Sequence, residues 1–140
     1  MKVLIVCSTA FYNRIDKIKE ELERLGHQVT TPNHYDEPDF NDDAYNMTDE
    51  EYLEFFKSCY YESREKVSKV DAILVLNYSK EKNGKILENY IGASTFLEMY
   101  EAFMNNKKIY MINGYPDNML LDEIKGFNPV IINEDLTIVK

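Results

Sequence analysis

The chain has 140 residues and a formal net charge of −9 at pH 7. One domain over residues 1–140 suits this length, and a second domain does not fit comfortably beside it. Its 16 basic residues are scattered among 25 acidic ones, whereas nucleic-acid surfaces need clustered lysines and arginines. The composition therefore excludes a polymeric nucleic acid as partner and disfavours an anionic membrane.

The first apolar run, Val3–Cys7, is too short for a signal-peptide core or a membrane span. We therefore expect a cytoplasmic protein without membrane contact. The two cysteines, Cys7 and Cys59, are too few and too far apart for a disulfide framework or a zinc site. They are expected to be reduced thiols.

Short apolar runs alternate with helical patterns along the chain, which is typical of an α/β protein with a parallel sheet. In chain order, we predict a strand at 1–7, a helix at 14–25, a strand at 27–31, a helix at 48–70, a strand at 71–77, a helix at 92–106, a strand at 107–113, a helix at 118–125 and a strand at 130–133.

Two of these helices have terminal signals of their own. Gly26 follows the first helix as a residue suited to the left-handed turn that ends a helix. Thr48, with Glu51 three residues later, forms a capping box. The second helix is therefore predicted to begin at Thr48.

Two connections are long enough to be functional. The first, over 33–47, is acidic and holds His34, Tyr35, Asp36, Glu37, Asp39, Asp42 and Asp43. Carboxylates are ligands for hard cations, but the spacing is not that of a calcium-binding loop. We favour a solvated acidic loop, and expect no metal.

The second connection, over 78–91, is predicted to be a polar loop with a local basic cluster. Its cationic side chains are Lys80, Lys82 and Lys85. Such a cluster suits a phosphate or a carboxylate. A mobile solvated lid is the other interpretation.

The turn after the first strand contains Ser8 and Thr9, followed by Tyr12. Backbone N–H groups and hydroxyls at a helix start can bind an anion. The alternative is that Ser8 or Thr9 only caps the helix. The glycine spacing of a dinucleotide-binding turn is absent.

Glu98 lies near the start of the predicted helix over 92–106, which follows a buried strand and the basic connection. Ligands of open α/β sheets bind outside the carboxyl ends of the strands. A carboxylate at this position is a candidate nucleophile. In the alternative interpretation, Glu98 and Glu101 only stabilise the helix through its dipole.

These segments resemble the nucleoside 2-deoxyribosyltransferase superfamily, which includes the 5′-deoxynucleotide N-hydrolases. The similar segments are the first strand ending in Ser8-Thr9, the strand at 70–76, and Gly92-Ala-Ser-Thr-Phe-Leu-Glu98-Met-Tyr-Glu-Ala102 followed by 107–112. The resemblance implies a flavodoxin-like or Rossmann-like three-layer α/β sandwich with a five-stranded, mainly parallel sheet.

The resemblance also implies an enzyme of nucleotide metabolism, a hydrolase or transferase that acts on the N-glycosidic bond of a (deoxy)nucleoside or its 5′-monophosphate, with no cofactor. It places the nucleophilic glutamate at Glu98, whose carboxylate can trap C1′ as a glycosyl ester before the sugar passes to water or a second base. Tyr12 or a neighbouring hydroxyl is expected to orient that carboxylate. The expected substrate-binding residues are Ser8, Thr9, Phe11, Tyr12, Asn77, Asn89, Tyr90, Gly92, Ser94 and Thr95.

Three positions depart from the superfamily's pattern. The usual glycine two residues after the glutamate is Tyr100, and the usual aspartate six residues before it is Gly92. An acidic residue on the preceding helix would fall on Ser63. Besides catalysis, a non-catalytic nucleotide or nucleotide-sugar binding module therefore stays open.

A third hypothesis is an oligomeric interaction protein. In it, Phe96, Met99, Tyr100 and Phe103 form a subunit interface. Members of the superfamily commonly form dimers or larger oligomers through this region, so an interface and a site can coexist. We expect a homo-oligomer with a small nucleoside or nucleotide as its ligand.

Overall fold

The computed structural model describes residues 1–37, 46–117 and 120–140. Its elements are β1 (Lys2–Val6), η1 (Thr9–Arg14), α1 (Ile15–Arg24), β2 (Gln28–Thr30), α3 (Asp49–Ser68), β3 (Ala72–Val75), β4 (Lys80–Lys82), β5 (Lys85–Leu87), α4 (Ala93–Met104), β6 (Lys108–Met111), α5 (Leu121–Gly126), β7 (Val130–Ile131) and η3 (Leu136–Ile138).

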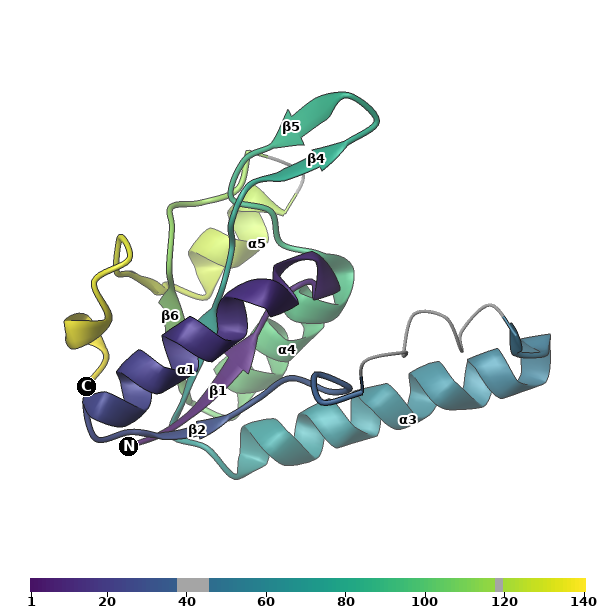
Figure 1. Cartoon of the computed structure of the whole chain (residues 1–140), viewed down its shortest axis with the longest axis horizontal. Helices are drawn as coiled ribbons and strands as arrows, with labels where there is room; N and C mark the ends of the chain where they lie inside the picture. Colours follow the sequence, from purple (N-terminus) through teal and green to yellow (C-terminus); the bar gives the residue numbers. More distant parts are fainter. Residues whose placement is uncertain (38–45, 118–119) are drawn as a thin grey trace.

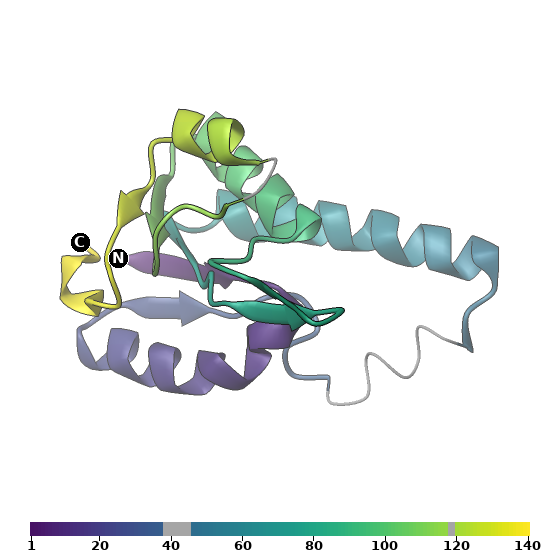
Figure 2. The same ribbon diagram turned by 90° about the horizontal axis from the view of Figure 1, so that it is seen from above.

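The main sheet has five strands in the order β2-β1-β3-β6-β7, and every neighbouring pair is parallel. Helix α1 covers one face, while α3, α4 and α5 lie on the other (Figures 1 and 2). This arrangement confirms the predicted three-layer α/β sandwich. It also places the segments that follow β1, β2 and β3 along one edge of the sheet, where ligands of such folds bind.

Alternate residues of the central strands build two cores. Val3 and Ile5 of β1 face α1, whereas Leu4 and Val6 face α3 and α4. All four are at most 1% exposed. Since successive side chains of a strand point to opposite faces, the unbroken apolar run of β1 is the mark of a strand covered on both sides.

The Thr48 cap of the capping box predicted at the start of α3 is confirmed. The Thr48 hydroxyl accepts a hydrogen bond from the backbone N–H of Glu51 at 3.2 Å, which satisfies one of the unpaired donors at the helix end. The helix then continues to Ser68.

The connection over 78–91 is not a simple loop. It folds into an antiparallel hairpin of β4 and β5, which projects from the body of the molecule (Figure 1). Asn83 and Gly84 have φ angles of 53° and 74°. An Asn-Gly pair with both φ angles positive is the preferred two-residue hairpin turn, so the prediction missed a signal present in the sequence.

The proposed interface on α4 needs a correction, because its four residues do not share an exposed face. Met99 is fully buried, and the partly buried Phe96 packs against Phe127 with a ring-centroid distance of 5.6 Å. Tyr100 and Phe103 are about half exposed. Only these last two could contribute exposed area to a subunit interface.

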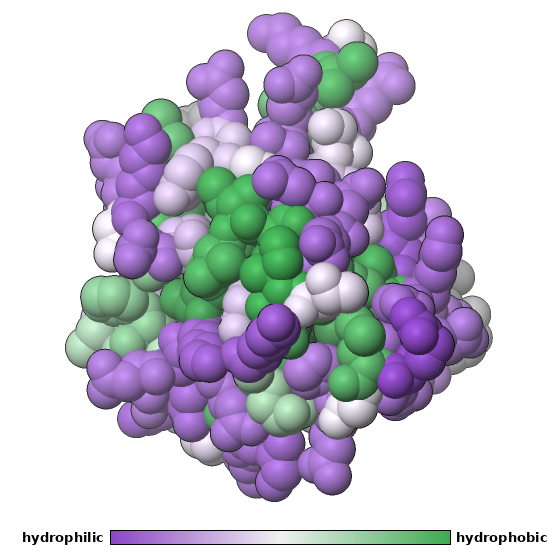
Figure 3. All heavy atoms as spheres, turned by 90° about the vertical axis from the view of Figure 1, so that its left-hand side faces the viewer, coloured by the Kyte–Doolittle hydropathy of each residue, from purple (hydrophilic) through white to green (hydrophobic). Residues whose placement is uncertain are grey.

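Some predictions lie outside the described residues. Asp39, Asp42 and Asp43 of the acidic connection, and the predicted start of a helix at 118, are among them. Within the described parts of the chain, no helix is both long enough and apolar enough to cross a membrane. The face near the two chain ends gathers hydrophobic side chains at its centre, with hydrophilic ones around them (Figure 3).

Candidate active site

A cavity of about 810 Å³ opens at the carboxyl edge of the sheet. Residues that follow β1 and β2 form one side, and the facing surfaces of α3 and α4 form the other. Such a volume lies within the range of small-molecule sites.

Glu98, in the second turn of α4, lines this cavity. The Ser63 hydroxyl of α3 donates a hydrogen bond to its Oε1 at 2.9 Å. Burial raises the pKa of the Glu98 carboxyl to about 7, because the charged form loses hydration. The Ser63 hydrogen bond and the charge of Lys66 oppose this rise only in part.

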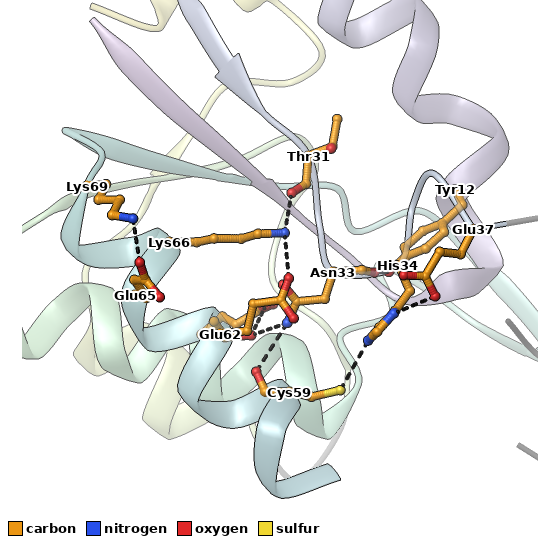
Figure 4. Close-up of polar contacts among 12 residues, drawn as sticks. Tyr12, Thr31, Asn33, His34, Glu37, Cys59, Glu62, Glu65, Lys66 and Lys69 are labelled. Carbon is orange, nitrogen blue, oxygen red and sulfur yellow. Dashed lines mark hydrogen bonds and ion pairs between the residues drawn. The ribbon is translucent and has the colours of Figure 1, made fainter. Parts of the chain in front are cut away.

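Lys66 is held in place from two directions. Its Nζ donates to the backbone oxygen of Thr31 at 3.2 Å and lies 3.4 Å from Oε1 of Glu62 (Figure 4). The cation is therefore fixed near Glu98 without bonding to it directly, and favours its ionised form.

A chain of hydrogen bonds supports Ser63 from the side of β2. Asn33 Nδ2 donates to the Ser63 oxygen at 2.9 Å and to the backbone oxygen of Cys59 at 3.1 Å. Tyr12 in turn donates to the backbone oxygen of Asn33 at 2.8 Å. Through hydrogen bonds, Tyr12 is connected to Glu98 by way of Asn33 and Ser63, and the hydroxyl that donates to the carboxyl is that of Ser63.

Two further acidic groups beside Glu98 stay protonated. Burial, followed by the charge of Glu98, raises the pKa of Cys7 to about 12. Burial also raises the pKa of Tyr12, with added contributions from Cys7 and Glu98. Cys7 is therefore an unreactive thiol, and both cysteines are free, as predicted.

A second cluster of polar groups lies beside Cys59, which precedes Ser63 by one helical turn on α3. Nδ1 of His34 is 3.0 Å from Oε2 of Glu37, and its Nε2 is 3.4 Å from Sγ of Cys59 (Figure 4). His34 has a φ of 61°, in the left-handed region that histidine adopts more readily than most residues. The imidazole also contacts the Phe55 ring, at a centroid distance of 5.0 Å.

No family model and no curated protein matches the chain. A solved structure does, that of the CMP N-glycosidase BcmB of Clostridium botulinum. The two chains are 16% identical, with a TM-score of 0.53, over 94% of this chain and 83% of that one. The chain shares the fold of that enzyme. At this identity the likeness shows the fold alone.

The structure brings most of the predicted site residues to the cavity. Those that line it are Ser8, Thr9, Tyr12, Tyr90, Gly92, Ser94, Thr95 and Glu98. Ser8 also accepts a hydrogen bond from the N–H of Ala10 at 3.3 Å, so it caps η1 as the alternative interpretation held.

Three predicted binding residues lie outside the cavity lining. Phe11 is buried, with its ring 5.6 Å from that of Tyr78. Asn77 is fully buried and donates to the backbone oxygen of Gly114 at 2.8 Å. Asn89 donates to the backbone oxygen of Tyr115 at 3.2 Å. Each of these contacts ties one loop to another.

The aromatic residues that form the outer wall of the cavity were not predicted from the sequence. Tyr52, Phe55, Phe56 and Tyr60 of α3 line it. Their spacing of three and four residues places aromatic rings along one side of a helix, which is the signal that could have found them. From the hairpin, Lys80 reaches the site indirectly, because its Nζ lies 4.8 Å from the ring centre of Tyr90.

Within residues 1–37, 46–117 and 120–140, no group of three histidine, cysteine, aspartate or glutamate side chains could hold a metal ion. Polar pairs that join α3 to other elements line the cavity: Ser63 with Glu98, Cys59 with His34, and Arg64 with Glu101. This arrangement offers one carboxylate of intermediate pKa and one imidazole inside an aromatic enclosure.

Proposed function

We propose that this protein cleaves the N-glycosidic bond of a (deoxy)nucleoside or nucleoside 5′-monophosphate, with Glu98 as the nucleophile and water or a second base as the acceptor. The observation that carries the proposal is the Glu98 carboxyl, held by Ser63 inside a cavity of nucleoside size. The resemblance of the sequence gives the nucleophile the same position. The fold shared with a CMP N-glycosidase is consistent with this chemistry.

The reaction follows from the properties of a buried carboxylate. As the base departs with the electrons of the glycosidic bond, positive charge develops at C1′, and an ionised Glu98 combines with it to form a glycosyl ester. Water or another base then displaces Glu98, which leaves as a carboxylate, and the proton that the attacking water or base loses passes to the departed base. Since the pKa of Glu98 is about 7, roughly half of the carboxyl groups are ionised at neutral pH.

Ser63 replaces an acidic group in this proposal. A carboxylate at that position would raise the pKa of Glu98 further through like-charge repulsion. A hydroxyl instead donates a hydrogen bond that favours the ionised nucleophile. The departure of Ser63 from the superfamily's pattern is therefore compatible with nucleophilic attack.

A non-catalytic binding module is the second candidate. It is favoured by the absence of a carboxylate at both Ser63 and Gly92, because no acid stands at either position to protonate a departing base. Such a protein would bind a nucleotide equally well after Glu98→Gln.

The deciding experiment is a chromatographic assay for free base with a panel of nucleosides, deoxynucleosides and their 5′-monophosphates. We expect the wild type to release base and Glu98→Gln to lose at least about a thousandfold in rate, as is usual for a nucleophile. Glu65→Gln is the control, because Glu65 is an exposed carboxylate of α3 that pairs with Lys69 outside the cavity. Undiminished release by Glu98→Gln would refute the assignment, and binding without release by the wild type would favour the second candidate.

A further inference from the structure

The hydrogen bonds of His34 define which of its ring nitrogens carries the proton. Its side chain is 16% exposed and lines the same cavity as Glu98. Nδ1 lies 3.0 Å from a carboxylate oxygen of Glu37. Because an ionised carboxylate can only accept hydrogen bonds, Nδ1 is the donor in this pair. In the neutral ring, Nε2 is then the acceptor.

The partner of Nε2 agrees with this tautomer. Burial, followed by the charges of Glu62, Glu37 and Glu98, raises the pKa of Cys59, so its sulfur keeps its proton. The S–H group can then donate to Nε2 over 3.4 Å. A thiol is a weak donor, and a ligand N–H group can take its place at little cost.

The two polar pairs lie one helical turn apart along α3. Cys59 and Ser63 are four residues apart, so they are neighbours on one helix face. Ser63 contacts Glu98, and Cys59 contacts His34. The nucleophile and the imidazole therefore line the same cavity, each through one of two neighbouring partners on α3.

The aromatic wall beside His34 offers a surface on which a base can stack. Phe55 and Phe56 line the cavity, and Phe55 also contacts the His34 ring. Bases stack on aromatic side chains whatever their sequence identity, so stacking alone does not discriminate between them. Discrimination needs a hydrogen bond at the edge of the base, and the His34 imidazole offers an acceptor beside this wall.

We infer that Nε2 of His34 accepts a hydrogen bond from the exocyclic amino group of the base, so that the site selects cytosine or adenine over uracil or hypoxanthine. The inference rests on the proposed function for the class of ligand. With an amino base, the ligand N–H replaces the S–H of Cys59. With a carbonyl base, the exocyclic oxygen and Nε2 are both acceptors, so no hydrogen bond forms between them, which costs affinity.

The test measures binding by titration calorimetry, with Glu98→Gln as the parent variant so that no ligand is consumed. The ligands are the ribo- and 2′-deoxyribonucleoside 5′-monophosphates of cytosine, uracil, adenine and hypoxanthine. We expect each amino base to bind about tenfold more tightly than its carbonyl counterpart. His34→Asn should reduce this ratio to about twofold or less. Asparagine tolerates the left-handed φ at this position, so the turn is retained.

His27→Ala is the matched control, since His27 is the other histidine of the chain and contacts the terminal amine of Met1 rather than the cavity. It should keep the selectivity of the parent. Equal binding of amino and carbonyl bases, a preference for carbonyl bases, or selectivity that survives His34→Asn would overturn the inference. Release of base by the wild type would leave the proposed function standing in each case. Failure of every nucleotide to bind would overturn the inference, and it would overturn the proposed function as well if the wild type released no base from any nucleoside or nucleotide.

Discussion

The two halves of α3 meet the same cavity in different ways. The half over 60–68 packs against the body of the protein, where Val67 is fully buried and Ser63 reaches Glu98. The half over 49–59 extends beyond the sheet (Figure 2), and Phe55 and Phe56 are only partly buried. In the proposed function, the inner half sets the chemistry of the carboxyl group and the outer half supplies a surface for the ligand.

The largest expected effect concerns the inner half and the cost of burying Glu98. Glu98→Gln should stabilise the protein, because glutamine carries no charge that needs hydration. The pKa of Glu98 is raised from 4.5 to about 7 in the folded state. The wild type therefore loses stability as the pH rises from about 4.5 to about 7, and stays lower above that range.

The expected gain for Glu98→Gln is about 3 kcal/mol at pH 8 and close to zero at pH 4. Urea denaturation at the two pH values measures it, with Glu65→Gln as the exposed control. A gain that is the same at both pH values would mean that Glu98 is not the titrating group. The inner half would then not be the place where charge is buried.

The next effect belongs to the outer half. Phe55→Ala should weaken nucleotide binding by about tenfold, since stacking of one base on one aromatic ring contributes about 1–3 kcal/mol. Stability should change less than for a core phenylalanine, because Phe55 is only partly buried. Calorimetry measures the binding affinity, and urea denaturation measures the free energy of unfolding. Tyr61→Ala is the control, because Tyr61 is an exposed residue of the same helix.

A large loss of stability with unchanged binding would contradict the assignment of the outer half as a ligand surface. Phe55 would then be a packing residue like Val67. The comparison between the two halves of α3 would lose its basis.

A smaller effect is expected at the contact between Ser63 and Glu98. Ser63→Ala removes a hydrogen bond that lowers the pKa of Glu98, so this pKa should rise above about 7. The acidic limb of the pH profile of kcat/KM should move to higher pH. Base release should fall about fivefold at pH 6 and recover above pH 8.5. A uniform loss at every pH would instead assign Ser63 a role in binding.

Much of the fold could be predicted because its signals are local. The apolar run of β1 and the helix cap at Thr48 each depend on a few neighbouring residues, and both are found in the structure. The hairpin of β4 and β5 was also signalled locally, by Asn83 and Gly84. The predicted loop rested on the charges of this segment and not on its turn residues.

The candidate site was only partly predictable, because its contacts join distant segments. Glu98 was found through a motif, but its partner Ser63 lies 35 residues away in the sequence. His34 and Cys59 are 25 residues apart, and nothing in the spacing of the chain relates them. For Asn77 the prediction differed from the structure. Its place at the end of a strand suggested that it binds a ligand, whereas its amide donates to backbone oxygens and joins two loops.

The smallest expected effect lies at the outermost turn of α3. Thr48→Ala removes the cap on the N–H of Glu51 and should cost about 1 kcal/mol in the free energy of unfolding. The outer half makes few buried contacts, so this loss should appear mainly as local fraying. Hydrogen exchange should accelerate for amides over 49–55 and stay unchanged over 60–68. Exchange that accelerates equally along the whole helix would show that the two halves unfold as one unit. The ligand surface would then depend on the core as strongly as the carboxyl group does.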